Sequence, residues 1–266
     1  MSALLELQGV SRTFGGLRAV DDVSMQVQPG TIHALIGPNG AGKTTTFNLV
    51  NGLLGLSSGR VLFDGRDVSR MPVHRRAACG IARTFQTPQL FESMSVLETV
   101  MSGCHLGGRL GPFGSMLAVG RKRSEERDIV RRAGAILERL GIADLAEVTS
   151  RNLPYGHRRL LEVARALATT PKLLLLDEVA AGLNATETAR MANLVRSLAA
   201  DGMAVLLVEH DMDFVMGVSQ RITVLNFGSV LAEGTPQEIS SNQAVIDAYI
   251  GASDDEDAQH EPGELK

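Results

Sequence analysis

The stretch from Gly37 to Thr45 carries the clearest chemical signal in this sequence. It reads Gly-Pro-Asn-Gly-Ala-Gly-Lys-Thr-Thr, which completes the pattern G-x-x-x-x-G-K-[ST] directly after an apolar run, Ile32 to Ile36. In such a loop, backbone N–H groups turn inward around phosphate oxygens, and the N-terminus of the next helix adds its positive dipole. The residues predicted to bind nucleotide are Gly37, Pro38, Asn39, Gly40, Ala41, Gly42, Lys43, Thr44 and Thr45.

Within this loop, Lys43 is expected to reach the β- and γ-phosphates, and the hydroxyl of Thr44 is expected to bind Mg²⁺. The alternative is a glycine-rich turn between a strand and a helix that binds nothing. Such a turn gives no reason for a lysine and a hydroxyl directly after the last glycine, so the pattern favours nucleotide binding.

Two adjacent carboxylates, Asp177 and Glu178, follow the apolar run Leu173 to Leu176. This run predicts a buried strand, and the carboxyl end of a strand is where an open α/β sheet binds ligands. We expect Asp177 to hold Mg²⁺, directly or through water, and Glu178 to polarise an attacking water. Many strands end in acids, but a pair that follows a complete phosphate loop favours a functional role.

Strands and helices alternate along most of the chain, which predicts an α/β fold. Short strands are predicted at Leu4 to Val10, Ser24 to Val27, Ile32 to Ile36, Val61 to Phe63, Leu173 to Leu176, Ala204 to Val208 and Ile222 to Leu225. Helices are predicted at Thr44 to Asn51, Ala185 to Ala200 and Asp211 to Val218.

The pattern changes between Thr87 and about Ala168, where helical segments occur without strands. Gly103 to Gly120 is rich in glycine and is expected to form a loop. Arg121 to Leu140 is a charged amphipathic helix, and its basic residues are interleaved with acids. A solvated helix face is the simpler interpretation of these charges, and a docking surface is the alternative. We interpret the whole segment as an inserted helical subdomain.

The composition limits the class of protein. A chain of 266 residues with a net charge of −4 has no basic footprint, so nucleic acid is not an expected partner. Only two cysteines occur, which suits a reducing compartment. The N-terminus has no signal-peptide pattern, and the longest apolar runs are far shorter than the roughly 20 residues that span a bilayer. We therefore expect a cytoplasmic protein that reaches a membrane only through a partner.

A further motif gives the sequence a family resemblance that covers nearly the whole chain. The segment Leu-Pro-Tyr-Gly-His and the helix after it, Arg158 to Leu167, resemble the signature motif and helix of ABC-transporter ATPases. The segment Ala82 to Gln86 is similar to the family's Q-loop, and Ala181 to Asn184 is similar to its D-loop. The signature residues are Leu153, Pro154, Tyr155, Gly156 and His157.

Two single residues gain a meaning from this ordered series. His210, in Val-Glu-His-Asp, resembles the family's switch histidine, and Phe14 stands where the family stacks an aromatic ring on adenine. Taken alone, the histidine would be read as structural and the phenylalanine as core. Within this ordered series of motifs, both residues are instead interpreted as functional.

The resemblance extends to the ATP-binding subunits of importers for branched-chain and other hydrophobic amino acids. The segments similar to that subfamily are Phe14 to Val20, Gly80 to Gln86, Ala180 to Asn184 and Val245 to Gly251. The positions that depart from the family's patterns are Pro154, His157 and Val179. We expect these departures to affect the rate of ATP hydrolysis more than the fold or ATP binding.

The resemblance implies an ABC-type P-loop ATPase: a RecA-like α/β core, an antiparallel β-subdomain and an inserted helical subdomain. We expect residues 1–86 and 169–251 to form the ATP-binding core with its N-terminal β-subdomain. Residues 87–168 are expected to form the helical subdomain that carries the signature motif. Residues 252–266 are acidic and almost free of apolar residues, so we expect a disordered tail.

The resemblance also implies a mechanism with ATP and Mg²⁺. Two ATP-binding subunits close head to tail around two ATP molecules, with the phosphate loop of one facing the signature motif of the other. Glu178 activates water, while His210 and Gln86 contact the γ-phosphate region. The metal ligands are expected to be Thr44, Gln86 and Asp177.

The partners implied are a second ATP-binding subunit, identical or different, and two membrane-spanning permease subunits. A periplasmic binding protein would act indirectly, and the chain would lie peripherally at the cytoplasmic face of the inner or plasma membrane. One alternative is an ABC ATPase with another cargo, such as urea, an aromatic acid or lipopolysaccharide. Another is a soluble ABC ATPase, which would normally show two cassettes or a long coiled-coil insertion, whereas one phosphate loop and one signature occur here.

Overall fold

The computed structural model describes residues 2–84, 91–106 and 119–258. The first of its two sheets is antiparallel, with strand order β2-β1-β4-β5. Its strands are β1 (Leu5–Phe14), β2 (Leu17–Val27), β4 (Ser58–Phe63) and β5 (Arg66–Asp67).

The second sheet has the order β10-β9-β3-β8-β7-β6, and all neighbours in it run parallel except the β9–β10 hairpin. Two of its central strands, over residues 173–176 and 204–208, are unbroken apolar runs because both of their faces are covered. The strands are β3 (Ile32–Ile36), β6 (Ile81–Arg83), β7 (Leu173–Asp177), β8 (Ala204–Val208), β9 (Arg221–Asn226) and β10 (Ser229–Gly234).

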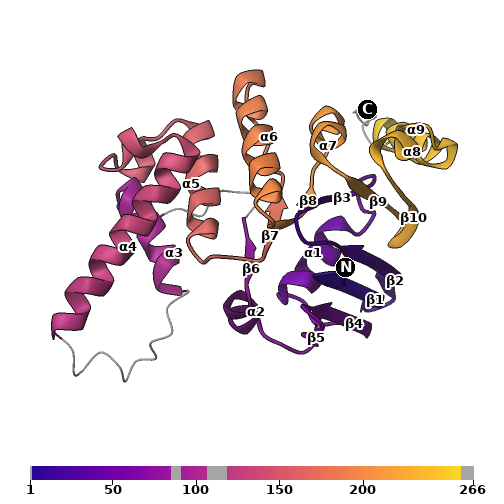
Figure 1. Ribbon diagram of the computed structural model, residues 1–266. Coiled ribbons are helices and arrows are strands. Elements are labelled where there is room, and N and C mark those ends of the chain that lie inside the picture. The colour runs from indigo at the N-terminus through magenta and orange to yellow at the C-terminus, as the bar shows by residue number, and fades with distance from the viewer. Residues whose placement is uncertain (1, 85–90, 107–118, 259–266) are drawn as a thin grey trace, which may run out of the picture.

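Helices surround this sheet and form a separate group at one end of the molecule. In Figure 1, α3, α4 and α5 lie together on the far side of α6 from the strands, whereas α1 lies between the two sheets. The helices are α1 (Lys43–Asn51), α2 (Val73–Cys79), α3 (Val96–Leu106), α4 (Val119–Leu140), α5 (Tyr155–Leu167), α6 (Ala185–Ala200), α7 (Met212–Val218), α8 (Pro236–Ser240) and α9 (Gln243–Ala258).

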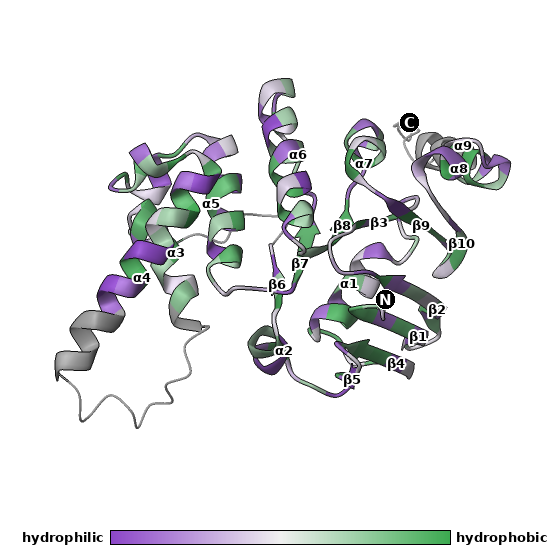
Figure 2. Ribbon diagram, in the orientation of Figure 1, coloured by the Kyte–Doolittle hydropathy of each residue, from purple (hydrophilic) through white to green (hydrophobic). Residues whose placement is uncertain are grey.

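Two apolar clusters fill the two faces of the parallel sheet. Leu174 and Leu176 of β7 join the cluster that packs against α5, α6 and α7, while Leu173 and Leu175 join the cluster that contains Phe47 of α1 and the antiparallel sheet. This division follows from the two-residue repeat of a strand, which sends successive side chains to opposite faces. Figure 2 shows the apolar colouring along these strands.

Several elements differ from the sequence predictions. The strands β6 and β10 and the helices α2, α8 and α9 were not expected, and α3 continues to Leu106, into the segment expected to be a loop. Helix α9 likewise extends to Ala258, so residues 252–258, which were expected to be disordered, continue a helix. Helix α4 begins at Val119, also within that expected loop, and what remains of the loop and of the tail lies outside the described residues. Among the described residues, no helix has the length and apolar character needed to cross a membrane.

The end of α1 is held by a buried guanidinium. Arg76 of α2 is 1% exposed and donates from Nη1 to the carbonyls of Leu49 and Val50, at 2.6 and 2.7 Å. It also donates from Nε to Met71 and from Nη2 to Ser69, at 2.9 and 3.1 Å. The last carbonyls of a helix have no partners within it, and a cation suits their negative dipole end. Arg76 therefore anchors the helix that follows the phosphate loop.

We predict that Arg76→Lys lowers the free energy of unfolding by about 3 kcal/mol, because one ammonium group cannot reach four carbonyls and leaves some of them buried without donors. Urea unfolding measures this change. Arg75→Lys, at the exposed neighbouring position, is the matched control and should leave the midpoint unchanged. Equal midpoints for the two variants would contradict the anchoring role.

Candidate functional site

Three neighbouring parallel strands bring the predicted functional residues to one edge of the sheet. In the backbone pairing, Val208 of β8 lies opposite both Leu35 of β3 and Asp177 of β7. The segments that leave these strands therefore start at nearly the same level. They are the phosphate loop after β3, Glu209 and His210 after β8, and Glu178 after β7.

The phosphate loop has the backbone shape that its glycines allow. Gly42 has a φ of 98°, and a β-carbon there would lie 2.5 Å from the carbonyl oxygen of Ala19. A β-carbon at Gly37 would lie 2.1 Å from the carbonyl oxygen of Leu225. The loop thus fits its neighbours only without side chains at these positions. Helix α1 begins directly after Gly42, with no side-chain cap and no acidic residue in its first turn, which suits a bound anion.

Lys43 folds back over the phosphate loop. Its Nζ donates to the carbonyls of Gly37 and Pro38, at 2.6 and 2.9 Å. Burial lowers the pKa of the Lys43 ammonium, and the nearby Glu178 carboxylate counteracts part of this effect. The lysine of the loop and the predicted base are therefore close enough to interact, as a shared nucleotide site requires.

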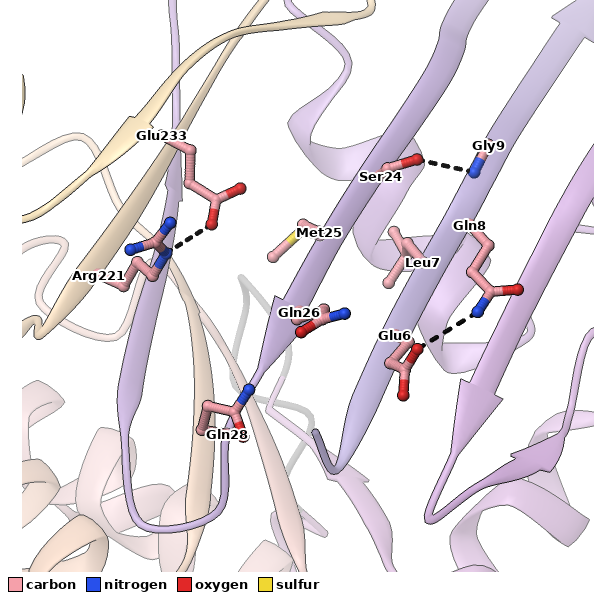
Figure 3. A pocket seen from close by; sticks show the side chains of 10 residues that line it. All are labelled: Glu6, Leu7, Gln8, Gly9, Ser24, Met25, Gln26, Gln28, Arg221 and Glu233. Atoms are coloured by element: carbon pink, nitrogen blue, oxygen red, sulfur yellow. Dashed lines mark hydrogen bonds and ion pairs between the residues drawn. The ribbon is translucent and has the colours of Figure 1, made fainter. Parts of the chain in front are cut away.

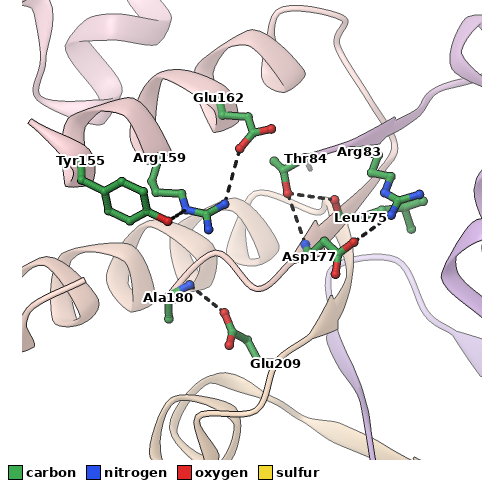
Figure 4. Close-up of polar contacts among 9 residues, drawn as sticks. All are labelled: Arg83, Thr84, Tyr155, Arg159, Glu162, Leu175, Asp177, Ala180 and Glu209. Carbon is green, nitrogen blue, oxygen red and sulfur yellow. Dashed lines mark hydrogen bonds and ion pairs between the residues drawn. The ribbon is translucent and has the colours of Figure 1, made fainter. Parts of the chain in front are cut away.

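Asp177 is bound to an arginine that sequence analysis did not single out. Arg83 at the end of β6 donates from Nη2 to Asp177 Oδ2 at 2.8 Å, and both side chains are almost fully buried. The same guanidinium donates from Nη1 to Asn48 Oδ1 of α1 at 2.6 Å. Figure 4 shows the pair together with Thr84, whose hydroxyl accepts from the Asp177 N–H at 3.3 Å. The arginine thus links three elements around the predicted metal ligand.

The donors present fit a magnesium ion that nucleotide brings with it. Mg²⁺ is usually held by one or two carboxylates together with substrate phosphates. Asp177 and the hydroxyl of Thr44 supply oxygen ligands of this kind, and the bond to Arg83 uses only one oxygen of Asp177. In the described part of the chain no group of three or more acidic, histidine or cysteine side chains could hold a metal alone.

Glu178 has an unusual backbone conformation. Its φ is 50°, in the left-handed region that residues other than glycine avoid, and its N–H donates to the carbonyl of Val208 at 2.9 Å. Its side chain is 26% exposed, which allows contact with water. His210 Nδ1 lies 4.0 Å from Glu178 Oε1, beyond hydrogen-bond distance, and the histidine side chain is 67% exposed.

The remaining predicted residues of the nucleotide site are Phe14 and Gln86. Phe14 ends β1, is 42% exposed, and has the guanidinium carbon of Arg12 at 4.6 Å from its ring centroid. An exposed ring of this kind is available for stacking. Gln86 lies outside the described residues.

The signature segment forms the start of α5. Pro154 is the N-cap residue, with φ −54° and ψ 154°, so the helix begins one residue later, at Tyr155. Leu153 is 4% exposed, and the Nδ1 of His157 is buried without a hydrogen-bond partner among the described residues. In Figure 1 this helix lies with α3 and α4, away from α1 and the phosphate loop. The structure therefore does not bring the signature motif and the loop together within this chain.

Tyr155 connects the signature segment to the D-loop. Its hydroxyl accepts from Arg159 Nε at 3.0 Å, and Arg159 lies 3.8 Å from Glu162, with both charged side chains buried. Figure 4 shows this row along α5. The tyrosine ring also lies so close to Gly182 that a β-carbon there would be 3.0 Å from Cε1. These contacts fix the orientation of the ring against the core.

Gly156 meets a carboxylate of the same chain. A β-carbon at Gly156 would lie 2.2 Å from Glu187 Oε1. Glu187 belongs to the capping box at the start of α6, where it accepts from the Asn184 N–H at 3.0 Å and donates its own N–H to Asn184 Oδ1 at 3.0 Å. A side chain at position 156 would therefore have to displace the Glu187 carboxylate.

We predict that Gly156→Ala lowers the free energy of unfolding by about 1–2 kcal/mol, because the methyl group displaces the Glu187 carboxylate and opens the capping box. In a Glu187→Ala background, Gly156→Ala should leave the free energy of unfolding almost unchanged. Urea unfolding of the single and double variants forms a double-mutant cycle. An equal loss in both backgrounds would contradict the contact.

The C-terminal helix reaches the phosphate loop. Tyr249 of α9 lies against the backbone of Gly37, and burial raises the pKa of its hydroxyl to about 12. The hydroxyl is therefore protonated at neutral pH. Sequence analysis did not identify Tyr249, Arg83 or Glu209, because their partners lie far away in the sequence.

A hollow of about 620 Å³ lies at the opposite end of the parallel strands, near the starts of β1 and β9 (Figure 3). Polar side chains line it, including the ion pair of Arg221 Nε with Glu233 Oε1 at 2.5 Å. None of the predicted nucleotide-site residues line this hollow. Beside it, burial lowers the pKa of His33 to about 4, so that ring is neutral at pH 7.

Comparison with known proteins agrees with this geometry. Residues 20–181 match the family model described as ABC transporter, and residues 229–255 match the model described as branched-chain amino acid ATP-binding cassette transporter. The high-affinity branched-chain amino acid transport ATP-binding protein LivG of Escherichia coli (strain K12) is 41% identical over 93% of this chain and 98% of its own length. The corresponding protein BraF of Pseudomonas aeruginosa is 39% identical, with the same shares covered.

A solved structure has the same architecture. The crystal structure of the ADP conformation of an ATP-binding cassette from an ABC transporter matches with a TM-score of 0.82 and 31% sequence identity. The match covers 94% of this chain and 100% of that chain. The two-sheet arrangement with its group of helices is therefore the fold of these cassettes.

Proposed function

This chain belongs to the ABC transporter family, as an ATP-binding cassette of the branched-chain amino acid type, and from this we propose that it hydrolyses ATP to power an importer for branched-chain or related amino acids. The observation that carries this proposal is the meeting of the phosphate loop, Glu178 and His210 at one edge of the sheet. The subunit would use ATP-driven closure of a dimer as its power step.

At each nucleotide, the N–H groups from Gly37 to Thr45 would bind the phosphates, and Phe14 would stack on the adenine. Lys43 would exchange its contacts with the loop carbonyls for the β- and γ-phosphates. Thr44 and Asp177, with Gln86, would hold Mg²⁺. That ion, when bound, neutralises developing charge on the phosphate oxygens.

Glu178 would act as the general base. Its partly exposed carboxylate stands next to Lys43 and His210, at the point where the γ-phosphate and a water would meet. His210 would contact the γ-phosphate. Gln86 would couple the presence or absence of the γ-phosphate to the helical segment 87–168.

The signature segment would complete the site of a second subunit. Because Leu153 to His157 lie away from the phosphate loop of their own chain, they are free to face that of a partner (Figure 1). The start of α5 would present N–H groups and its positive dipole end to the γ-phosphate. Pro154 has no N–H and no hydroxyl to offer, so Gly156 and the residues after it would make the contact.

We predict that Glu178→Gln binds ATP, fails to hydrolyse it and accumulates as a closed dimer, because the amide keeps the shape of the side chain but accepts no proton. Light scattering with ATP and Mg²⁺ measures the mass. Glu92→Gln, the same change at an exposed position, is the control and should turn over like the wild type. Turnover of Glu178→Gln at the wild-type rate would place the base elsewhere.

The assembly we propose contains two such ATP-binding subunits, two membrane-spanning permease subunits and, indirectly, a periplasmic binding protein. The chain would lie at the cytoplasmic face of the membrane and contact the permeases through the helical segment 87–168. The charged face of α4 offers a surface for such docking, with exposed side chains that include Arg127, Asp128 and Arg131. Residues 1–86 and 169–251 would supply the ATP-binding core.

We predict that this chain fractionates with membranes only when its permease subunits are co-expressed, and that a loaded binding protein then stimulates ATP hydrolysis. The physical reason is that the described residues offer no membrane-crossing helix of their own. Membrane flotation and ATPase assays in vesicles measure the two effects. Activity that is unaffected by the permeases would favour an ABC ATPase outside transport.

A further inference from the structure

Glu209 is a buried carboxylate that the mechanism above does not use. It follows β8 directly and is 1% exposed. Its Oε1 accepts from the N–H of Ala180 at 2.7 Å, and its Oε2 accepts from the N–H of His210 at 3.3 Å. Figure 4 shows the bond to Ala180. One side chain therefore binds both the loop that contains Glu178 and the loop that contains His210.

A carboxylate in this position is costly unless its charge is compensated. Burial raises the pKa of Glu209, and the N–H groups of Ala180 and His210 counteract that effect. Both donors are backbone groups, so the carboxylate restrains the path of the chain in two loops at once. A side chain with no acceptor would leave the Ala180 N–H buried without a partner.

The loop it restrains contains a strained residue. Glu178 has a φ of 50°, and a left-handed residue other than glycine costs about 1 kcal/mol or more. Such a conformation persists only where surrounding contacts enforce it. Here the carbonyl of Val208 holds the Glu178 N–H at 2.9 Å, and Glu209 holds the N–H of Ala180, two residues further along. Val208 and Glu209, which are consecutive at the end of β8, thus accept hydrogen bonds from the strained residue and from the residue two positions after it.

We propose that Glu209 is the positioning residue that sets the Glu178 carboxylate and the His210 ring relative to each other for ATP hydrolysis. The separation it maintains is 4.0 Å between His210 Nδ1 and Glu178 Oε1, with its own Oε2 also 4.0 Å from His210 Nδ1. The inference rests on the proposed function, since it assumes that Glu178 and His210 act on ATP. Glu209 itself acts through these two residues.

The experiment compares Glu209→Ala with Glu209→Gln in the assembled transporter. Alanine removes both acceptors, so kcat should fall by about ten- to a hundredfold while the affinity for ATP stays within about twofold. Glutamine keeps an oxygen for the Ala180 N–H, the shorter of the two bonds, and should restore kcat to within about threefold of the wild type. If the alanine variant does not fold, Glu209→Asp replaces it, because the shorter side chain cannot span both donors.

Two controls run in parallel. Thr235→Ala removes the N-cap of α8, a helix that carries none of the site residues, and shows how much a general loss of stability alone changes kcat. Glu178→Gln tests the proposed function itself. If Glu178→Gln hydrolyses ATP at the wild-type rate, the proposed role of Glu178 is wrong, and the positioning role of Glu209 falls with it. If Glu178→Gln is inactive and Glu209→Ala is fully active, the proposed function stands and only the positioning role of Glu209 is wrong.

Three further results would overturn the proposal. The first is a loss of ATP affinity in Glu209→Ala that matches its loss of kcat. The second is a glutamine variant as slow as the alanine variant. The third is a fall in kcat no larger than that of Thr235→Ala at equal thermal stability, since a purely structural carboxylate would give that outcome.

Discussion

The pairing of β8 with both of its parallel neighbours is the constraint on which the site depends. One residue, Val208, lies level with Leu35 and with Asp177. A shift of either strand by one residue would exchange its two buried faces, so packing enforces this alignment. The loops that leave the three strands consequently begin at fixed points, and the chemistry is built on the most rigid part of the molecule.

A few buried charged side chains in this protein connect its secondary-structure elements. Arg76 ties the end of α1 to α2, Arg83 ties β6 to β7 and α1, and Glu209 ties the loops after β7 and β8. Each of these groups is removed from water and bonded to backbone or to an opposite charge. Such arrangements are weak sources of stability, but breaking one partner is expensive, so they fix positions well.

The sequence predicted those features whose cause is local. The apolar runs of β3 and β8 and the periodic pattern of α6 gave the observed bounds, because these segments have unbroken or periodic apolar residues. Strand β6 has only three residues and gains its extended form from pairing with β7, so no local pattern reveals it. The residue motifs alone predicted the phosphate loop and the two carboxylates as parts of one site, and the family resemblance added the histidine. Arg83 and Glu209 stand within segments that carry the resemblance, but neither received a role, because their roles depend on partners distant in the chain.

The contacts of the phosphate loop also determine when, during synthesis of the chain, the surroundings of this loop can be completed. The loop is made early, yet the carbonyl oxygen of Leu225 fills the space beside Gly37, the N–H of Gly228 donates to Ala41 at 3.1 Å, and Tyr249 lies against Gly37. All three partners come from the last fifth of the sequence. A growing chain that emerges from the ribosome with its N-terminus first cannot make these three contacts until nearly the whole protein has been translated. A product that ends before Leu225 would thus lack every one of these contacts at the phosphate loop.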